Sequence, residues 1–405
     1  MLNWANQFSI FCFLDSCSYN DENSSFEWTL AVSAEADHCI HDGDSLNGLD
    51  EFVRSNRPAV FGHLSYDLKN IIDGNQEPPA DGFGFGYFFV PAILIEFKNA
   101  RLSITAGNEN IFDTINSFVC DDRPSIISAS LQPLQLREDY LTAIKKVKDH
   151  IKAGDCYELN YCMKYAGTAS QFNVINTYLE LTNISPVPFG SLYKKEGVYC
   201  ICATPERYIK IEGDTIISQP MKGTAKRYPG DELQDDMDKL ALYESIKDRT
   251  ENVMTVDLVR NDLSRICQAG TVNVRELFGI YSFATVHQMV STIEGKLKKD
   301  MGISEILKSS FPMGSMTGAP KKKVMELIGL YETNGRGLFS GSIGYMAANG
   351  DADLNVVIRS IFFDSATGKI WSYAGGAITY MSQAELEWEE CMTKLTAVQR
   401  VLGIK

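Results

Sequence analysis

A lysine and a glutamate in the middle of the chain have the residue types of a nucleophile and its proton carrier. Lys222 lies in the segment 219–224 (QPMKGT), where a proline precedes it and a Gly-Thr pair follows it. These neighbours hold the chain on a stiff path that can approach a ligand closely. Glu206 lies sixteen positions earlier, in TPER, and a carboxylate that folds back beside a lysine can take and return its proton. An ordinary ion pair or an anion anchor is the other interpretation of Lys222 that the local sequence leaves open.

A lysine must lose a proton before it can attack a carbon atom. The pKa of a free lysine is about 10.4, so the neutral amine costs roughly 4–5 kcal/mol at pH 7. Burial, or a base within hydrogen-bonding reach, lowers that cost. We therefore expect Lys222 in a closed pocket with Glu206 beside it.

Two acidic segments contain candidate metal ligands. Glu251 lies in KDRTEN, and Glu390 lies in ELEWEE near the C-terminus. Helical spacing places Glu387, Glu390 and Lys394 on one helix face. Mg²⁺ takes few protein carboxylates and completes its shell with water and substrate oxygens, so Glu251 and Glu390 could hold it if their helices approach. Solvated helix faces are the alternative, and only pairing across the two elements would make a site.

Groups that could bind an anion gather toward the C-terminus. Arg359 interrupts the apolar segment VVIR and could form a two-pronged bond with a carboxylate. Tyr345, in GSIGY, could donate to the same group. The segments 311–321 and 373–377 add turn amides and adjacent glycines, where backbone can approach a ligand closely. A structural ion pair is the alternative interpretation of Arg359.

Composition narrows the compartment and the partners. The 405-residue chain is 44% hydrophobic, and its net charge of −14 argues against nucleic acid and anionic membranes as partners. The ten cysteines include no C-x-x-C pair, so we expect free thiols in a reducing cytosol and a cytoplasmic protein. The apolar run 8–14 follows no Lys or Arg and predicts a strand, not a signal peptide. No stretch reaches the length of a membrane span.

Apolar periodicity predicts antiparallel sheets covered by helices, an α+β fold. Strand patterns recur through the first half of the chain, for example over 157–165. Helix patterns cover 140–151, closed by Gly154, and about 232–260. A terminal helix is expected from about Ser382, which begins the S-x-x-E spacing of a capping box.

The order and spacing of these segments resemble the chorismate-utilising enzyme family, which includes component I of anthranilate synthase and of aminodeoxychorismate synthase. The resemblance covers roughly residues 135–405 and is weak over 1–120, where HLSYDL carries most of it. The matching segments are 204–207, 219–224, 247–263, 311–321, 341–345, 375–377 and 385–394. The resemblance implies an antiparallel β-sandwich core with helices packed outside and an active site in a cleft between the sheets.

Two regions are also implied by the resemblance. An N-terminal region similar to anthranilate synthase component I would cover residues 1–125. A chorismate-binding catalytic domain would cover 135–405, and the two would interleave in one globular unit. The polar, proline-bearing segment 121–135 is expected to link them.

The residue at position 222 separates two activities within the family. Anthranilate synthases typically carry a small residue there, whereas a lysine is similar to aminodeoxychorismate synthases. The implied reaction is amination of chorismate at C4, a transaminase-class conversion. In it Lys222 attacks C2, the C4 hydroxyl leaves, and ammonia adds at C4 and expels the lysine, with Glu206 as acid and base. Ammonia would come from a glutamine amidotransferase subunit, and the product would lead to 4-aminobenzoate and folate.

The sequence leaves two other functions open. An anthranilate synthase component I, which makes anthranilate for tryptophan synthesis, is the rival enzyme. A silent regulatory homologue that binds an amino acid is a third interpretation, but it would have little use for Lys222, Glu206, Glu251 and Glu390 together. The segment 14–16 (LDS) is similar to the Leu-Glu-Ser of relatives that bind tryptophan, and whether an amino acid binds here is open.

The resemblance assigns the remaining site residues. Glu251 and Glu390 would bind Mg²⁺, which holds the ring carboxylate of chorismate. The residues implied in substrate binding are Gly223, Thr224, Tyr345, Arg359, Gly375, Gly376, Ala377 and Lys394. Gln288 stands where anthranilate synthases carry a catalytic histidine. That departure favours the lysine mechanism and leaves the proton donor to the departing hydroxyl open.

Overall fold

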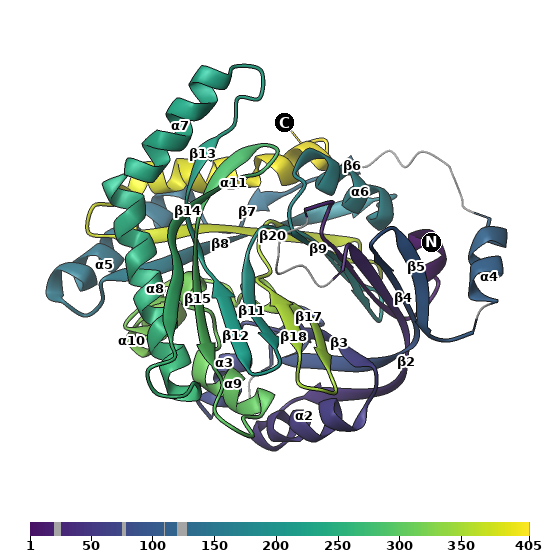
Figure 1. Cartoon of the computed structure of the whole chain (residues 1–405). Coiled ribbons are helices and arrows are strands. Elements are labelled where there is room, and N and C mark those ends of the chain that lie inside the picture. The colour runs from purple at the N-terminus through teal and green to yellow at the C-terminus, as the bar shows by residue number, and fades with distance from the viewer. Residues whose placement is uncertain (20–25, 75–77, 109, 120–127, 405) are drawn as a thin grey trace.

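The computed structural model describes residues 1–19, 26–74, 78–108, 110–119 and 128–404 (Figure 1). The strands are β1 Ile10–Asp15, β2 Trp28–Ile40, β3 Ala59–Leu64, β4 Gly86–Lys98, β5 Arg101–Ala106, β6 Ser128–Ala129, β7 Gln132–Pro133, β8 Glu158–Ser170, β9 Phe189–Lys195, β10 Val198–Thr204, β11 Arg207–Glu212, β12 Thr215–Gln219, β13 Met221–Lys226, β14 Asn273–Ser282, β15 Val286–Lys296, β16 Gly318–Ala319, β17 Ser342–Ala347, β18 Ala352–Asn355, β19 Ser360–Asp364 and β20 Lys369–Thr379. The helices are α1 Leu2–Ala5, α2 Gly43–Ser55, α3 Leu68–Ile72, α4 Ile111–Ser117, α5 Arg137–Ala153, α6 Val174–Ile184, α7 Glu232–Glu244, α8 Ile246–Ile266, α9 Ile303–Ser310, α10 Lys321–Tyr331 and α11 Ala384–Val401, with a 3-10 turn at Gly314–Met316.

Strand β4 joins two branches of one antiparallel sheet. It pairs with β2 along most of its length and with β3 over its first four residues, 86–89. From β2 the first branch continues through β1, β9, β10, β19, β20 and β8. From β3 the second branch continues through β17, β18, β11, β12 and β15, and β15 also pairs with β13 and β14. The two sheets expected from the sequence are therefore two branches connected through β4.

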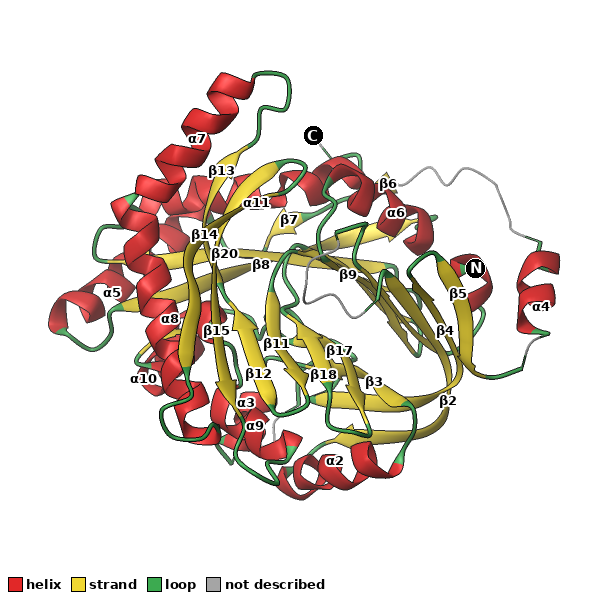
Figure 2. Cartoon of the chain, viewed as in Figure 1, coloured by secondary structure: helices red, strands yellow, loops and turns green. Residues whose placement is uncertain are grey.

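Alternation along the strands creates two hydrophobic cores. In β1, Ile10, Cys12 and Leu14 point into one core, whereas Phe11 and Phe13 point into the other. The first core also receives side chains of β11, β12 and β18, so it lies between the two branches. The second core receives the apolar faces of α5, α6 and α11. These helices lie outside the strands (Figure 2), and the predicted α+β fold is confirmed.

The expected helices are present, with two changes. Helix α5 ends at Gly154, which has a left-handed φ of 84°, as predicted. The stretch 232–260 is divided at Ser245, whose side chain accepts a hydrogen bond from the Asp248 N–H and begins α8. The capping box at Ser382 is wrong. The Ser382 hydroxyl instead accepts from the Thr379 N–H, and α11 begins at Ala384 without a side-chain cap.

Strands from the two predicted regions pair directly. β1 pairs with β9, and β3 pairs with β17, so residues on both sides of the predicted region boundary share one sheet. The predicted linker 121–135 lies in part outside the described residues, and the two region boundaries stay predictions. Within the described ranges, every helix is too short or too polar to cross a membrane.

Candidate active site

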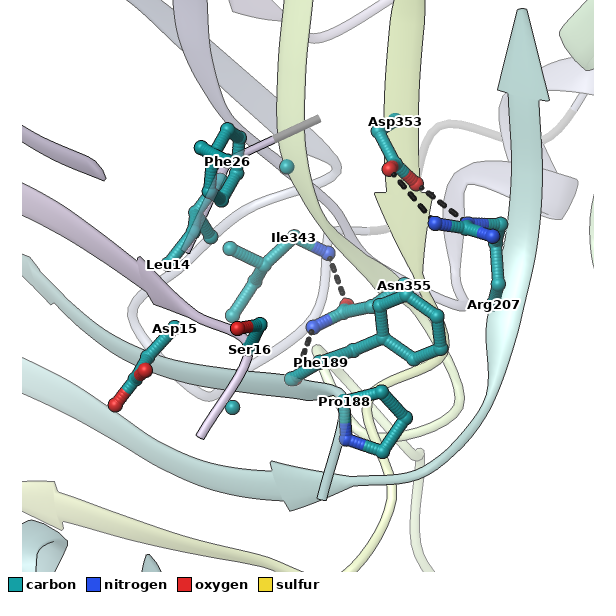
Figure 3. A pocket seen from close by; sticks show the side chains of 12 residues that line it. Leu14, Asp15, Ser16, Phe26, Pro188, Phe189, Arg207, Ile343, Asp353 and Asn355 are labelled. Atoms are coloured by element: carbon teal, nitrogen blue, oxygen red, sulfur yellow. Dashed lines mark hydrogen bonds and ion pairs between the residues drawn. The ribbon is translucent and has the colours of Figure 1, made fainter. Parts of the chain in front are cut away.

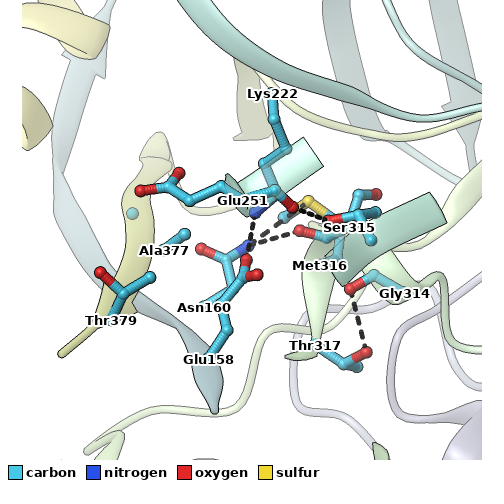
Figure 4. Close-up of polar contacts among 12 residues, drawn as sticks. Glu158, Asn160, Lys222, Glu251, Gly314, Ser315, Met316, Thr317, Ala377 and Thr379 are labelled. Atoms are coloured by element: carbon cyan, nitrogen blue, oxygen red, sulfur yellow. Dashed lines mark hydrogen bonds and ion pairs between the residues drawn. The ribbon is translucent and has the colours of Figure 1, made fainter. Parts of the chain in front are cut away.

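Four elements that are distant in the chain bring one lysine and three glutamates together. Lys222 comes from β13, Glu158 from the first position of β8, Glu206 from the turn after β10, and Glu251 from α8. Figure 4 shows Lys222 reaching toward Glu158, with Glu251 beside both. Helix α8 packs against β13 and β15, which places its buried face at this point.

The closest contact is between Lys222 and Glu158. Lys222 Nζ donates to Glu158 Oε1 at 2.6 Å, and the two side chains are only 10% and 3% exposed. Burial acts to lower the pKa of Lys222, but the charges of Glu158, Glu251 and Glu206 and the hydrogen bond to Glu158 outweigh it and raise the pKa. Lys222 is thus an ammonium in this state, and a proton acceptor lies in contact with it.

Glu206 lies beside the same lysine and forms other bonds. Burial raises the pKa of Glu206 to about 7, against opposing hydrogen bonds from Ser315 and the Met221 N–H and the positive charges of Lys222 and Arg359. Glu206 and Ser315 also line a small pocket together with Pro220 and Gly314. A carboxyl group with a pKa near neutrality can both give and take a proton at neutral pH.

Gln288 connects three of the residues predicted to bind substrate. Its Nε2 donates to the Gly223 carbonyl at 2.6 Å, and its Oε1 accepts from Thr224 Oγ1 at 3.0 Å. Arg359 makes a longer contact of 3.5 Å with the same Oε1. Gly223 has φ of 83°, and an added Cβ would lie 2.8 Å from Asp248 Cβ, so the residue after Lys222 fits only as glycine.

The candidate metal ligands lie around Lys247. The Lys247 ammonium is 3.9 Å from both Glu251 Oε1 and Glu387 Oε1, and the charge of Glu390 also raises its pKa. Glu251 Oε1 is buried and has no hydrogen-bond partner within the described ranges. An orphaned carboxylate oxygen in an acidic cluster fits a hard cation such as Mg²⁺. In the same ranges no three His, Cys, Asp or Glu side chains form a metal-binding group.

The glycines of β20 lie against the acidic face of α11. A Cβ added at Gly376 would be 3.3 Å from Glu387 Oε2 and 3.5 Å from Glu390 Oε1. Lys394 Nζ donates to the Gly375 carbonyl at 2.7 Å and pairs with Glu390 at 2.8 Å. The next residue, Ala377, pairs with β8 two residues beyond Glu158. Gly375, Gly376 and Ala377 therefore lie along one strand, and Lys394 bonds to that strand from α11.

Tyr345 is placed with a different set of neighbours. Its ring lies 5.8 Å from those of Phe26 and Phe61, and neither contact joins it to Lys222 or Arg359. The adjacent Ile343 and Gly344 line a separate pocket. The proposed bond from Tyr345 to a substrate carboxylate stays a prediction, without support from these contacts.

That separate pocket contains the segment 14–16 noted in the sequence. Figure 3 shows this segment facing Phe189 and Asn355. Two sets of polar groups in the pocket are bonded, whereas the buried Ser16 hydroxyl has no hydrogen-bond partner within the described residues. Arg207 makes two bonds to Asp353, at 2.9 and 3.1 Å, and Asn355 bridges the Ile343 N–H and the Phe189 carbonyl.

Sequence reasoning missed several groups of the site. Glu158 is the most important, because it and not Glu206 is hydrogen-bonded to Lys222. A signal existed, since Glu158 lies at the second position of the predicted strand 157–165, and buried carboxylates are rare unless paired. The sequence contained no comparable signal for Ser315 or for Lys247.

The sequence of this chain is similar to those of several known proteins. Residues 10–400 match the chorismate binding enzyme family. Aminodeoxychorismate synthase component 1 of Escherichia coli K12 is 36% identical over 276 residues, which are 68% of this chain and 60% of that protein. The chloroplastic aminodeoxychorismate synthase of Arabidopsis thaliana is 38% identical over 271 residues, 66% of this chain and 29% of that protein. The chain thus matches less than two thirds of each of these two relatives.

A further relative matches more of its length. The anthranilate synthase component I-like protein of Synechocystis is 31% identical over 375 residues, 90% of this chain and 76% of that protein. Among solved structures, anthranilate synthase component I of Streptococcus pneumoniae has a TM-score of 0.82 at 21% identity, covering 94% of this chain and 93% of that one. The menaquinone-specific isochorismate synthase MenF of Escherichia coli has a TM-score of 0.80 at 16% identity, covering 99% and 90%. These structures share the fold, and the chain belongs to the chorismate binding enzyme family.

Proposed function

We propose that this enzyme aminates chorismate at C4 and releases 4-amino-4-deoxychorismate. The observation that carries the proposal is a buried lysine, Lys222, held among carboxylates in a site of the chorismate binding family. Relatives named aminodeoxychorismate synthase that are 36% and 38% identical support the choice of product.

The chain's own residues provide the reacting groups. Lys222 adds to C2 of the ring, and the C4 hydroxyl leaves with a proton from Glu206. Ammonia then adds at C4 and the bond from C2 to Lys222 breaks, so the hydroxyl is replaced with net retention. The pKa of Glu206, raised to about 7 by burial, suits a group that gives a proton at neutral pH.

Glu251 and Glu390 would hold Mg²⁺ at the ring carboxylate of chorismate. The ion would neutralise negative charge that otherwise favours the ammonium form of Lys222. The buried, unpartnered Oε1 of Glu251 supports this assignment. Glu387 and Lys247 lie in the same cluster, and the ion pairs of Lys247 with Glu251 and Glu387 would weaken when the cation binds.

The second carboxylate of chorismate would meet Arg359 and the backbone near Gly376. Burial lowers the pKa of Arg359, while the charge of Glu206 opposes this change. Thr224 and Lys394 would complete the walls of the pocket. Glu158, Glu206 and Glu251 at the centre of this site are buried, which limits the contact of water with the reacting groups.

A glutamine amidotransferase subunit would supply the ammonia. The name "component 1" of the Escherichia coli relative supports a second component. The product would keep its enolpyruvyl group, and a separate lyase would convert it to 4-aminobenzoate for folate. The nine described cysteines are free, which supports a reducing compartment such as the cytoplasm.

Anthranilate synthase component I is the second candidate, because the Synechocystis relative of that type matches 90% of the chain. The test is incubation of the purified enzyme with chorismate, ammonium chloride and Mg²⁺, followed by chromatography and mass analysis. We expect 4-amino-4-deoxychorismate, which a lyase then converts to 4-aminobenzoate. Anthranilate as the main product would overturn the proposal.

A further inference from the structure

Glu158 is fixed in place by the sheet on both of its sides. Glu158 pairs with Thr379 of β20 and with Ala319 of β16. Gly318 packs so tightly against this point that an added Cβ would lie 2.1 Å from the Glu158 carbonyl oxygen. The backbone that carries the carboxylate therefore cannot shift freely, and the carboxylate is presented to Lys222 in a defined direction.

Glu158 and Glu206 have different hydrogen-bond partners. Glu158 Oε1 contacts the amine of Lys222 at 2.6 Å, whereas Glu206 bonds to Ser315 and to the Met221 N–H. Glu251 Oε1 has no hydrogen-bond partner in the described part of the chain, so the Lys222–Glu158 pair is not bonded to that oxygen. One carboxyl group thus lies at the amine, and another lies beside it with different partners.

We infer that Glu158 is the base that removes the proton from Lys222 Nζ and returns it at the end of each cycle. The inference rests on the proposed function, because it concerns how Lys222 becomes a nucleophile. A base must lie within about 2.6–3.2 Å of the proton it takes, and Glu158 meets that condition. Glu206 is then available to the departing hydroxyl, whose proton donor the sequence left open.

The protons and electron pairs balance under this assignment. The proton of Lys222 passes to Glu158, and the freed electron pair forms the bond from Nζ to C2. The ring double bonds shift, the C4–O bond breaks, and the hydroxyl leaves as water with the proton of Glu206. When ammonia adds at C4, the bond from Nζ to C2 breaks and Lys222 recovers its proton from Glu158. The new amino group gives its extra proton to Glu206.

Replacing Glu158 by glutamine separates proton transfer from simple positioning. Glutamine keeps the size and a hydrogen-bonding oxygen, but it cannot take the proton. With chorismate and Mg²⁺ and without ammonia, the mass of quenched protein reports the Lys222 adduct. We expect Glu158→Gln to slow adduct formation by about 10²–10⁴-fold. Adduct formation within twofold of the wild-type rate would overturn the inference.

A second variant and a matched control guard against a folding defect. Glu158→Asp keeps the charge but shortens the side chain, so an intermediate rate is expected. Glu212→Gln removes the carboxylate of another Lys–Glu pair, 3.0 Å from Lys210 and distant from the site, and should leave the rate unchanged. Circular dichroism of each variant checks the fold.

A substrate-free measurement keeps the inference testable if the wild-type enzyme forms no adduct and no aminated product. Cyanate is small and carbamylates only neutral amines, and the exposed Lys226 of the same strand serves as an internal reference. Without substrate, loss of the Glu158 charge should lower the pKa of Lys222 and make it react about tenfold faster with cyanate in Glu158→Gln. Adduct formation still slows in this variant, because the bound chorismate dianion favours the ammonium form and no base is left to remove its proton. Equal labelling rates would show that Glu158 does not control this proton, whereas a silent wild-type enzyme would contradict only the proposed function.

Discussion

Gln288 holds the backbone beside the candidate nucleophile, because its Nε2 donates to the carbonyl oxygen of Gly223 at 2.6 Å. Its Oε1 accepts from Thr224, so both ends of the amide are used. Gln288 itself is buried in β15, whose pairing with β13 fixes the distance between the two strands. The position of Lys222 therefore depends on an amide that both donates and accepts.

Gln288→Glu tests this dependence, since the change replaces the donor with a second acceptor facing the Gly223 carbonyl. A buried polar group left unpaired costs about 1–3 kcal/mol, and we expect kcat to fall by about 10–100-fold. Gln268→Glu is the matched control, because Gln268 makes the same type of bond to the Leu297 carbonyl at 2.9 Å outside the site. Equal kinetics for the two variants would contradict the positioning role.

Lys222→Ala should abolish the reaction and the covalent adduct. We expect a loss of about 10⁴-fold or more, as for other nucleophiles that act with a partner group. Mass spectrometry of protein quenched during turnover should show an adduct in the wild type and none in this variant. Lys226→Ala removes a lysine of the same strand that instead contacts the ring of Tyr228, and it should retain the adduct. An adduct on Lys222→Ala would show that another residue is the nucleophile.

Most helices and strands of this fold could be predicted from the sequence. Apolar patterns predicted β1 and the first part of β8, and Gly154 correctly marked the end of α5. The sequence did not reveal the interruption at Ser245, because no glycine or proline marks the boundary between the two helices. Ser382 had a suitable spacing for a cap, but its hydroxyl bonds to the turn that precedes it.

The site was harder to predict from the sequence, because its contacts join residues that are far apart in the chain. Lys222 and Glu158 are separated by 64 positions. The pairing of β8 with β16 and β20, which places Glu158 at the site, cannot be predicted from the periodicity of any one strand. The sequence points to Glu206 as the partner of Lys222, because only sixteen positions separate the two residues. The family resemblance gave the residue types but could not assign their hydrogen bonds.

The reaction should lose activity as pH rises through about 7. Burial raises the pKa of Glu206 from about 4.5 to about 7, and its acid form must be present when the hydroxyl leaves. The rate of adduct formation measured without ammonia avoids the ionisation of ammonia itself. We expect that rate to fall above pH 7 in the wild type, and to be low and without this limb in Glu206→Gln. A wild-type rate that rises steadily to pH 9 would exclude Glu206 as the acid.

The same shift predicts a stability effect that requires no substrate. The folded state binds the Glu206 proton more tightly than the unfolded state, so this stabilisation is complete below about pH 4.5 and is lost as pH rises through about 7. Its size is up to about 3 kcal/mol. Urea unfolding at pH 6 and pH 8 should therefore show a smaller pH effect in Glu206→Gln than in the wild type.

Gly223→Ala should move Lys222 as well as destabilise the chain. Its φ of 83° disfavours any side chain by about 1–2 kcal/mol, and the added Cβ would meet Asp248 Cβ at 2.8 Å. Gly213→Ala is the control, because its φ is 60° and nothing lies within 4 Å of an added Cβ. Urea unfolding should show a larger loss for Gly223→Ala, and only that variant should lose kcat. Equal losses of stability and of kcat in the two variants would mean that Asp248 moves away from the added Cβ without destabilising the chain.

Removal of Mg²⁺ should abolish both chorismate binding and the reactivity of Lys222. The positive charges that face the acidic cluster are side chains already paired with Glu251, Glu387 or Glu390, so a dianion would meet uncompensated negative charge without the ion. Thermal unfolding supplies a readout besides activity, because Mg²⁺ at a hundredfold its dissociation constant should stabilise the folded chain by about 2.7 kcal/mol. Glu251→Gln should lose this response, whereas Glu244→Gln, at an exposed position on α7, should keep it. Substantial turnover in excess chelator would show that Lys222 reacts without the ion and would separate the metal from the nucleophile.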